Sequence, residues 1–164
     1  MMKRLLLVTV FLTGLPPVFA LDSACEPLLK ASEAKLAQES WHSITESKEL
    51  KVQAIKLKGE YFVEFDGKWQ KSPMDMNQAE IAALELIKSG TLKITECKDE
   101  GSETLDGIDM QVFSYSSEMP GSGVPKTTSK LYICKADGLP YKTLLDQEGS
   151  VNTIKYQDIS PPKI

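Results

Sequence analysis

Two tight hairpin turns constrain the fold of this chain more than any other feature. The dipeptides Lys58-Gly59 and Asp66-Gly67 lie at either end of a short, largely apolar run at residues 60–65. Glycine-containing pairs of this kind form two-residue turns, and such turns join neighbouring antiparallel strands. The segment therefore predicts an antiparallel β-meander.

The side chains of the strands around these turns are predicted to alternate between the two faces of the sheet. Tyr61 and Phe65 lie at alternate positions with Phe62 between them, so Phe62 is expected to point to the opposite side of the sheet. In the preceding strand, at residues 50–57, the apolar alternation shifts by one residue. We therefore expect a β-bulge near Ala54.

Two helices are expected to accompany the strands. The first spans residues 22–39, where Ser23 and Glu26 have the spacing of a capping box. The second begins with Ser72 as its N-cap and ends before Gly90. Apolar residues cover most of the girth of the second helix, so it is either buried in the core or faces a dry groove.

The C-terminal half of the chain is predicted to be all-β, with turn signals such as Asp106-Gly107 between apolar runs. The acidic stretch at residues 99–109 does not match an EF-hand, because Gly101 stands where a ligand belongs, and we interpret it as a solvated hairpin tip. The candidate strands are residues 91–97, 109–117, 129–135, 141–145 and 151–157.

Residues 1–20 have the layout of a secretory signal peptide. A basic start is followed by an apolar run that is too short to span a bilayer, and Ala20 fits the cleavage site. Cys25 lacks the leucine three residues before it that a lipid-anchored cysteine requires, so we expect cleavage after Ala20 without acylation. Residues 21–164 are then predicted to form one domain in the periplasm.

The charge balance argues against two classes of partner. Loss of Lys3 and Arg4 leaves 17 basic residues against 23 acidic ones, a net charge of −6. Nucleic acids and anionic membrane surfaces both select clustered Lys and Arg, so neither is expected as a partner. The mature chain also contains no apolar run long enough for a transmembrane segment.

The mature chain keeps three cysteines, and an exported protein is expected to pair two of them. If the C-terminal strands pair in sequence order, one strand separates Cys97 from Cys134. Strands two apart lie roughly 9–10 Å from each other, beyond the roughly 7 Å Cα separation that a disulfide allows. Cys25 should therefore pair with either Cys97 or Cys134. We favour a Cys25–Cys97 disulfide and a free Cys134, because Cys97 lies at a strand end that the start of the first helix could reach.

No motif for catalysis or cofactor binding stands out. His42 is the single histidine, and the chain has no Gly-x-Ser-x-Gly elbow to supply a nucleophile for it. The cysteine spacing does not fit a zinc site, and residues 121–127 carry Pro125 where a phosphate loop requires glycine. We accordingly expect neither an enzyme nor a bound metal or other cofactor.

Most aromatic residues fall on the predicted strands. Several of these strands have apolar groups on both faces, so the sheet is either sandwiched or offers an apolar surface. Ordinary core packing accounts for the same pattern. If the sheet instead encloses a ligand, the predicted cavity wall consists of Tyr61, Phe65, Trp69, Phe113 and Tyr115.

Four segments carry a resemblance to a known family: the hairpin end at residues 66–69, the helix after Ser72-Pro73, the strand and turn at residues 130–140, and the terminal strand at residues 156–161. In this order they resemble the periplasmic lipoprotein-carrier (LolA-like) superfamily. The resemblance implies an α+β fold, in which an unclosed antiparallel β half-barrel wraps over an N-terminal helix and a mid-chain helix.

The same resemblance implies a function. It predicts a non-enzymatic periplasmic protein that binds or carries a lipid, an acyl chain or another apolar ligand. The alternative is an interaction module that docks onto an envelope protein and has no ligand cavity. A cavity in the folded protein would favour the first hypothesis, and a filled core would favour the second.

Overall fold

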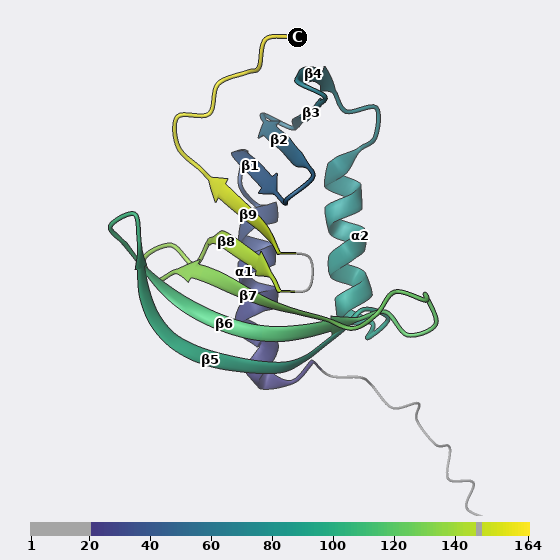
Figure 1. Cartoon of the computed structure of the whole chain (residues 1–164), viewed down its shortest axis with the longest axis vertical. Helices are drawn as coiled ribbons and strands as arrows, with labels where there is room; N and C mark the ends of the chain where they lie inside the picture. Colours follow the sequence, from purple (N-terminus) through teal and green to yellow (C-terminus); the bar gives the residue numbers. More distant parts are fainter. Residues whose placement is uncertain (1–20, 147–148) are drawn as a thin grey trace, which may run out of the picture.

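The computed structural model describes residues 21–146 and 149–164, and the predicted signal peptide with its cleavage site lies outside these residues. Antiparallel strands form one strongly curved sheet (Figure 1). The strands are β1 (Ser40–Glu46), β2 (Lys51–Leu57), β3 (Glu60–Phe65), β4 (Lys68–Lys71), β5 (Lys93–Leu105), β6 (Ile108–Glu118), β7 (Thr127–Cys134), β8 (Pro140–Leu145) and β9 (Ser150–Lys155).

The sheet is an open half-barrel. Its spatial order is β4-β3-β2-β1-β9-β8-β7-β6-β5, so only the β1–β9 pair joins strands that are distant in sequence. Within the described part of the chain, β4 and β5 are the two edges and do not pair with each other. The predicted α+β fold with an unclosed antiparallel half-barrel is thereby confirmed.

Both predicted hairpins form as two-residue turns. Lys58 and Gly59 have φ values of 50° and 81°, and Asp66 and Gly67 have values of 50° and 74°. Two successive residues with positive φ are typical of a type I′ turn, whose twist matches that of the flanking strands. The turn chemistry therefore sets the pairing of β2 with β3 and of β3 with β4.

The predicted bulge near Ala54 is wrong. Ala54 pairs with Ser43 on one side and Val63 on the other, in an unbroken register. The apparent phase shift has another cause, because consecutive residues of β2 are buried on opposite faces. Ile55 lies opposite Phe62 on one face, and Lys56 is buried on the other.

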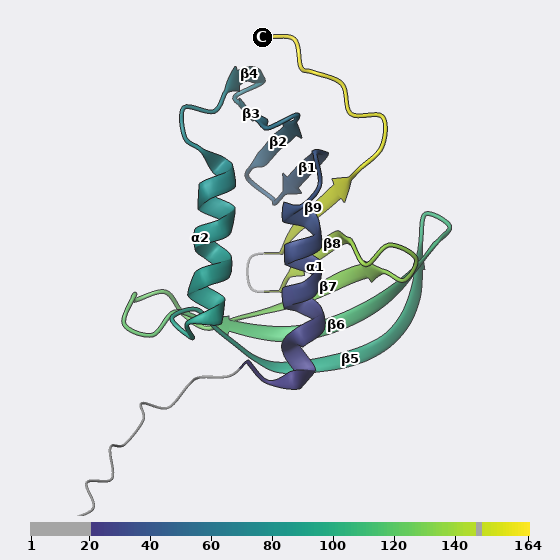
Figure 2. The ribbon, with the colours of Figure 1, turned by 180° about the vertical axis from the view of Figure 1, so that it is seen from behind.

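Two helices lie side by side on one face of the sheet (Figure 2). In the first, α1 (Glu26–Leu36), Leu28 and Ala31 pack against Phe113, Leu131 and Ile133 of the sheet. The second is α2 (Met76–Lys88). None of the helices in the described residues has the length and apolarity needed to cross a bilayer.

Neither helix begins at the residue that the sequence predicted. Asp22 caps a short 3-10 turn, η1 (Ser23–Cys25), and α1 follows it with no side-chain cap. At α2 the N-cap is Asp75, whose carboxylate accepts from the backbone N–H groups two and three residues on. The Ser72 hydroxyl instead bonds within its own turn, to the backbone of Met74. An acidic N-cap also complements the positive end of the helix dipole.

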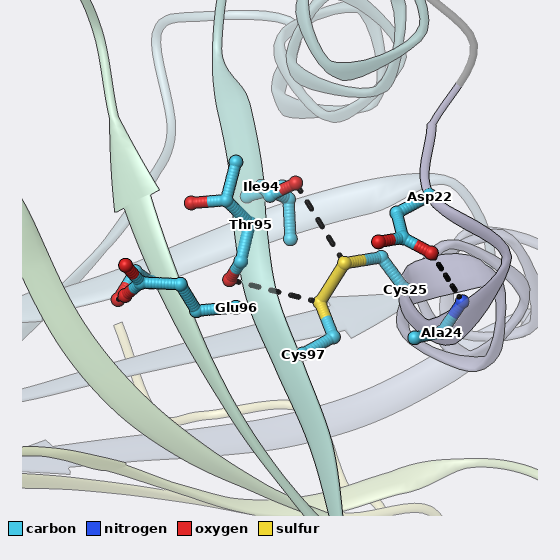
Figure 3. Close-up of a disulfide and its surroundings, with 8 residues drawn as sticks. Asp22, Ala24, Cys25, Ile94, Thr95, Glu96 and Cys97 are labelled. Carbon is cyan, nitrogen blue, oxygen red and sulfur yellow. Dashed lines mark hydrogen bonds between the residues drawn. A yellow bond between two sulfur atoms is a disulfide. The ribbon is translucent and has the colours of Figure 1, made fainter.

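A disulfide ties the start of α1 to the edge strand β5 (Figure 3). Cys25 and Cys97 are bonded with a Cα–Cα distance of 5.2 Å, and Cys134 is free and buried on β7. Since β6 lies between β5 and β7, the predicted pairing and its geometric reason are both confirmed. Cys97 lies in a bulge of β5, where Glu96 has a positive φ.

The acidic stretch at residues 99–109 is mostly strand, which corrects the predicted hairpin tip. β5 continues to Leu105, and the turn itself is confined to Asp106 and Gly107. Asp99 holds the extended chain by accepting from the backbone N–H of Gly101 and from the side chain of Gln111 on β6. The long β5–β6 hairpin gives the sheet its pronounced curl (Figure 1).

A second apolar cluster covers the face of the sheet away from the helices. It consists of Met110, Val112, Tyr132 and Cys134, all buried. Their strand neighbours Phe113, Leu131 and Ile133 contact α1, so alternation along the strands directs this cluster to the other side. Apolar groups on both faces of β6 and β7 therefore reflect packing on both sides of the sheet.

Candidate functional site: a cavity between the helices and the sheet

A cavity of about 330 Å³ lies between α1, α2 and the helix-covered face of the sheet. Its volume is at the lower end of the range for small-molecule sites. The two helices and strands from β5 to β9 form its walls. The lining residues are Leu21, Cys25, Leu28, Leu29, Ser32, Lys35, Leu36, Glu80, Ala83, Leu84, Ile87, Ile94, Tyr115, Leu131, Pro140, Thr143, Asn152 and Ile154.

The helix α2 forms one wall of this cavity and is not a core helix. Its lining residues Glu80, Ala83, Leu84 and Ile87 recur at three- and four-residue spacing, which places them on one face. Among the described residues of α2, Leu84 alone is fully buried, and Leu86 on another face is 37% exposed. Of the two predicted arrangements, the structure has the helix facing a groove.

Polar groups in the middle of the cavity bond to the protein itself. The Ser32 hydroxyl donates to the Leu28 carbonyl at 3.0 Å, which satisfies an α1 backbone group. On the floor, the Asn152 amide donates to Thr45 Oγ1 at 2.8 Å. Burial raises the pKa of Tyr115, so its phenol stays neutral. The middle of the cavity therefore presents a mostly apolar wall.

One end of the cavity is charged. Lys35 Nζ of α1 lies 2.5 Å from Glu80 Oε1 of α2, and both side chains line the cavity. The same ammonium lies 4.2 Å from the centroid of the Trp41 ring, within cation–π range. A second ion pair between the helices joins Lys88 to Glu33 at 3.0 Å, but it is about half exposed. Such exposed pairs contribute little, so the Lys35–Glu80 pair is the stronger link.

The structure separates the five aromatic residues predicted for the cavity wall. Tyr115 lines the cavity, and Phe113 packs beside it against α1. Tyr61 lies on the same face but further along the sheet, where it packs against Trp41. Burial, followed by the charges of Glu80 and Asp75, raises the pKa of Tyr61 to about 12. Whether any of them contacts a ligand stays a prediction.

Like Phe113 and Tyr61, the remaining two predicted wall residues are not among the residues that line this cavity. Phe65 ends β3 at the hairpin and is 61% exposed. Trp69 pairs with Glu64, which shares a face with Phe62, and this pairing turns Trp69 away from the helices. There its ring lies 6.0 Å from that of His42, centroid to centroid. The β3–β4 turn is the reason, since it fixes which β4 residue faces each side.

The predicted cavity wall named no helical residue, although a second helix that faces a groove was one of the two predicted arrangements. Ala83, Leu84 and Ile87 form one wall, although the sequence placed the wall only on strands. Their spacing along α2 was a usable signal. The charged end had no comparable signal, because Lys35 and Glu80 are 45 residues apart and meet only when the two helices dock.

His42 lies outside the cavity, on the opposite face of the sheet. Its Nε2 is 2.9 Å from the side-chain oxygen of Gln53, and burial lowers its pKa. Gln53 in turn donates to Glu64 at 2.5 Å, so the three side chains form a hydrogen-bonded row across β1, β2 and β3. In the described residues, no group of three or more potential ligands could hold a metal ion.

Comparisons with known proteins agree with the fold. LprF from Mycobacterium bovis has a TM-score of 0.56 at 10% identity, over 85% of this chain and 96% of that protein. The Mycobacterium tuberculosis lipoprotein LppX has a TM-score of 0.55 at 10% identity, over 84% and 97% of the two chains. A LolA-superfamily protein from Nitrosomonas europaea also matches, with a TM-score of 0.34 at 11% identity, over 86% and 94%.

No protein-family model matches the sequence, and no curated protein matches it. At identities this low, the likeness to LprF and LppX concerns the fold. The comparisons therefore support the fold that the resemblance implied, and they go no further than the fold.

Proposed function

We propose that this protein is an exported, non-enzymatic binder or carrier of a lipid or another apolar ligand in the periplasm. The observation that carries the proposal is the cavity of about 330 Å³, whose walls are mostly apolar along α1, α2 and the sheet. An apolar wall in an exported protein favours a ligand that gains free energy by leaving water. The fold shared with LprF and LppX is compatible with this proposal.

Because burial of hydrocarbon drives binding, the affinity should depend on the length of the ligand's acyl chain. Burying one methylene group contributes about 0.8 kcal/mol, which corresponds to about fourfold in affinity. In a homologous series of acyl chains, each added methylene should therefore tighten binding about fourfold until the cavity is filled. Beyond that length, additional methylenes remain in water and the affinity should level off.

Two neighbouring alanines on α2 allow a matched test. Both alanines are exposed, but Ala83 lines the cavity and Ala82 does not. Ala83→Phe should fill part of the cavity and weaken binding of a fluorescent fatty acid by about tenfold or more, a loss of about 1.4 kcal/mol. Ala82→Phe adds the same ring at the helix surface and should leave binding unchanged.

The titration of the wild type and both variants decides the proposal. Wild-type binding that is lost in Ala83→Phe and retained in Ala82→Phe supports a ligand site in the cavity. Equal affinity for all three proteins would place the binding elsewhere on the molecule. No binding by the folded wild type, for any chain length, would refute the proposed function.

A further inference from the structure

A second, more deeply buried cation lies beside the charged end of the cavity and is not among its lining residues. Lys56 of β2 is only 5% exposed, and its Nζ donates to the Leu36 carbonyl at 2.9 Å and to Asn77 Oδ1 at 3.4 Å. Both of these partners are neutral. Burial lowers the pKa of Lys56, and the carboxylate of Glu80 partly offsets this effect while Lys35 adds to it. The group formed by Lys35, Lys56 and Glu80 thus has two ammonium groups and one carboxylate, a formal charge of +1.

Two buried polar atoms at this end have no hydrogen-bond partner among the described residues. They are the indole Nε1 of Trp41 and the second carboxylate oxygen, Oε2, of Glu80. Both residues contact Lys35, one through its ring and the other through its Oε1. Buried polar atoms without partners cost about 1–3 kcal/mol each and are rare in folded proteins. Of these two residues only Glu80 lines the cavity, and its Oε2 is an acceptor, so the unpartnered atoms do not themselves select the charge of a ligand head.

The opposite end of the cavity is apolar. Leu28, Ile87 and Ile94 line it beside Cys25, the buried cysteine of the disulfide. Along α1, the seven residue steps from Leu28 to Lys35 correspond to a rise of about 10 Å. The cavity therefore has an apolar end and a charged end that are separated by about two turns of helix, an arrangement that suits a molecule with a hydrocarbon chain and one polar head.

We propose that the cavity takes a single-chain amphiphile with an anionic head, a carboxylate or a phosphate, whose oxygens contact Lys35 while its chain extends toward Cys25. This inference rests on the proposed function and adds the chemical class of the ligand. The formal surplus of positive charge selects an anion over a cation or a neutral head. Glu80 competes with that head for Lys35.

Four probes with the same alkyl chain test the head group. Dodecanoate and dodecyl phosphate carry the proposed anions, dodecanol is neutral, and dodecyltrimethylammonium is cationic. We expect both anions, or one of them, to bind the wild-type protein at least about tenfold more tightly than the other two probes in calorimetric titrations. Stronger binding of the phosphate would identify a phosphate monoester head, and stronger binding of dodecanoate a free fatty acid.

Substitutions then show which residues cause the preference for anionic probes. Lys35→Met should abolish the advantage of the anions over dodecanol, and Glu80→Gln should increase it because the competing carboxylate is gone. Lys30→Met is the matched control, since this lysine lies on the same helix, is 70% exposed and does not line the cavity. Lys56 is buried and holds α1 and α2 through two hydrogen bonds, so its substitution would also disturb folding. The proposal is therefore tested at Lys35 and Glu80, whose side chains are about one-fifth exposed.

The outcomes separate this inference from the proposed function. Equal binding of dodecanol and the anions, or preference for dodecyltrimethylammonium, would overturn the anionic head while leaving the carrier proposal intact. An anion preference that survives in Lys35→Met at the same magnitude would overturn the assigned head site. Failure of the folded wild type to bind any of the four probes would instead refute the proposed function itself.

Discussion

Reduction of the Cys25–Cys97 disulfide should cost a large part of the stability of the fold. The bonded residues are 72 positions apart, so the bond closes a long loop in the unfolded chain, and the chain-entropy estimate for that loop is about 4 kcal/mol at 25 °C. The disulfide also fixes the start of α1 against β5, and α1 supplies one wall of the cavity. Loss of this bond should therefore lower both stability and ligand binding.

Urea unfolding with and without dithiothreitol measures this effect. We expect reductant to lower the free energy of unfolding of the wild type by about 4 kcal/mol, and to have no effect on a Cys25→Ala/Cys97→Ala double variant. Cys134 is the internal control, because it is free and buried and should accept a thiol label only after unfolding. An unchanged unfolding midpoint on reduction of the wild type, or three labelled thiols in the unfolded and unreduced chain, would refute this reasoning.

Three further predictions concern the core, a titration and a turn. Met110→Ala should destabilise the protein by about 2–5 kcal/mol in urea unfolding, because Met110 is fully buried, whereas Ile108→Ala on the same strand should cost much less. Burial lowers the pKa of His42, so unfolding should take up a proton there; stability should decline as the pH falls through 6.5 toward the folded value, and His42→Gln should remove that dependence. An NMR titration of His42 that gave a pKa above 6.5 would contradict this sign. Gly67→Ala should cost about 1 kcal/mol, because Gly67 has a φ of 74°, and an unchanged melting temperature would count against the turn assignment.

Local chemistry was sufficient to predict the hairpins and the disulfide. A two-residue turn specifies both the direction and the pairing of its strands, so β2, β3 and β4 followed from Lys58-Gly59 and Asp66-Gly67. The same turn contained information that the sequence interpretation did not use. A turn at residues 66–67 pairs Glu64 with Trp69, which places Trp69 on the face of Phe62 and away from the cavity.

The charged end of the cavity could not be predicted in the same way. Lys35, Lys56 and Glu80 come from α1, β2 and α2, and their meeting depends on how these elements dock. Lys56 in particular occupies a helix-facing position in a strand, where an apolar residue is expected, and its apolar neighbour Ile55 suggested a bulge instead. Helix boundaries failed for a similar reason, since Ser72 and Asp75 are both good N-caps and only the fold selects between them.

The central claim is that the cavity between α1, α2 and the sheet holds an apolar ligand. Native mass spectrometry of the protein isolated from the periplasm without detergent tests it most directly. The account predicts a complex with one bound amphiphile, recovered by lipid extraction and absent from Ala83→Phe but present in Ala82→Phe. Ligand-free protein throughout, with no uptake of added fatty acid by the folded wild type, would contradict it.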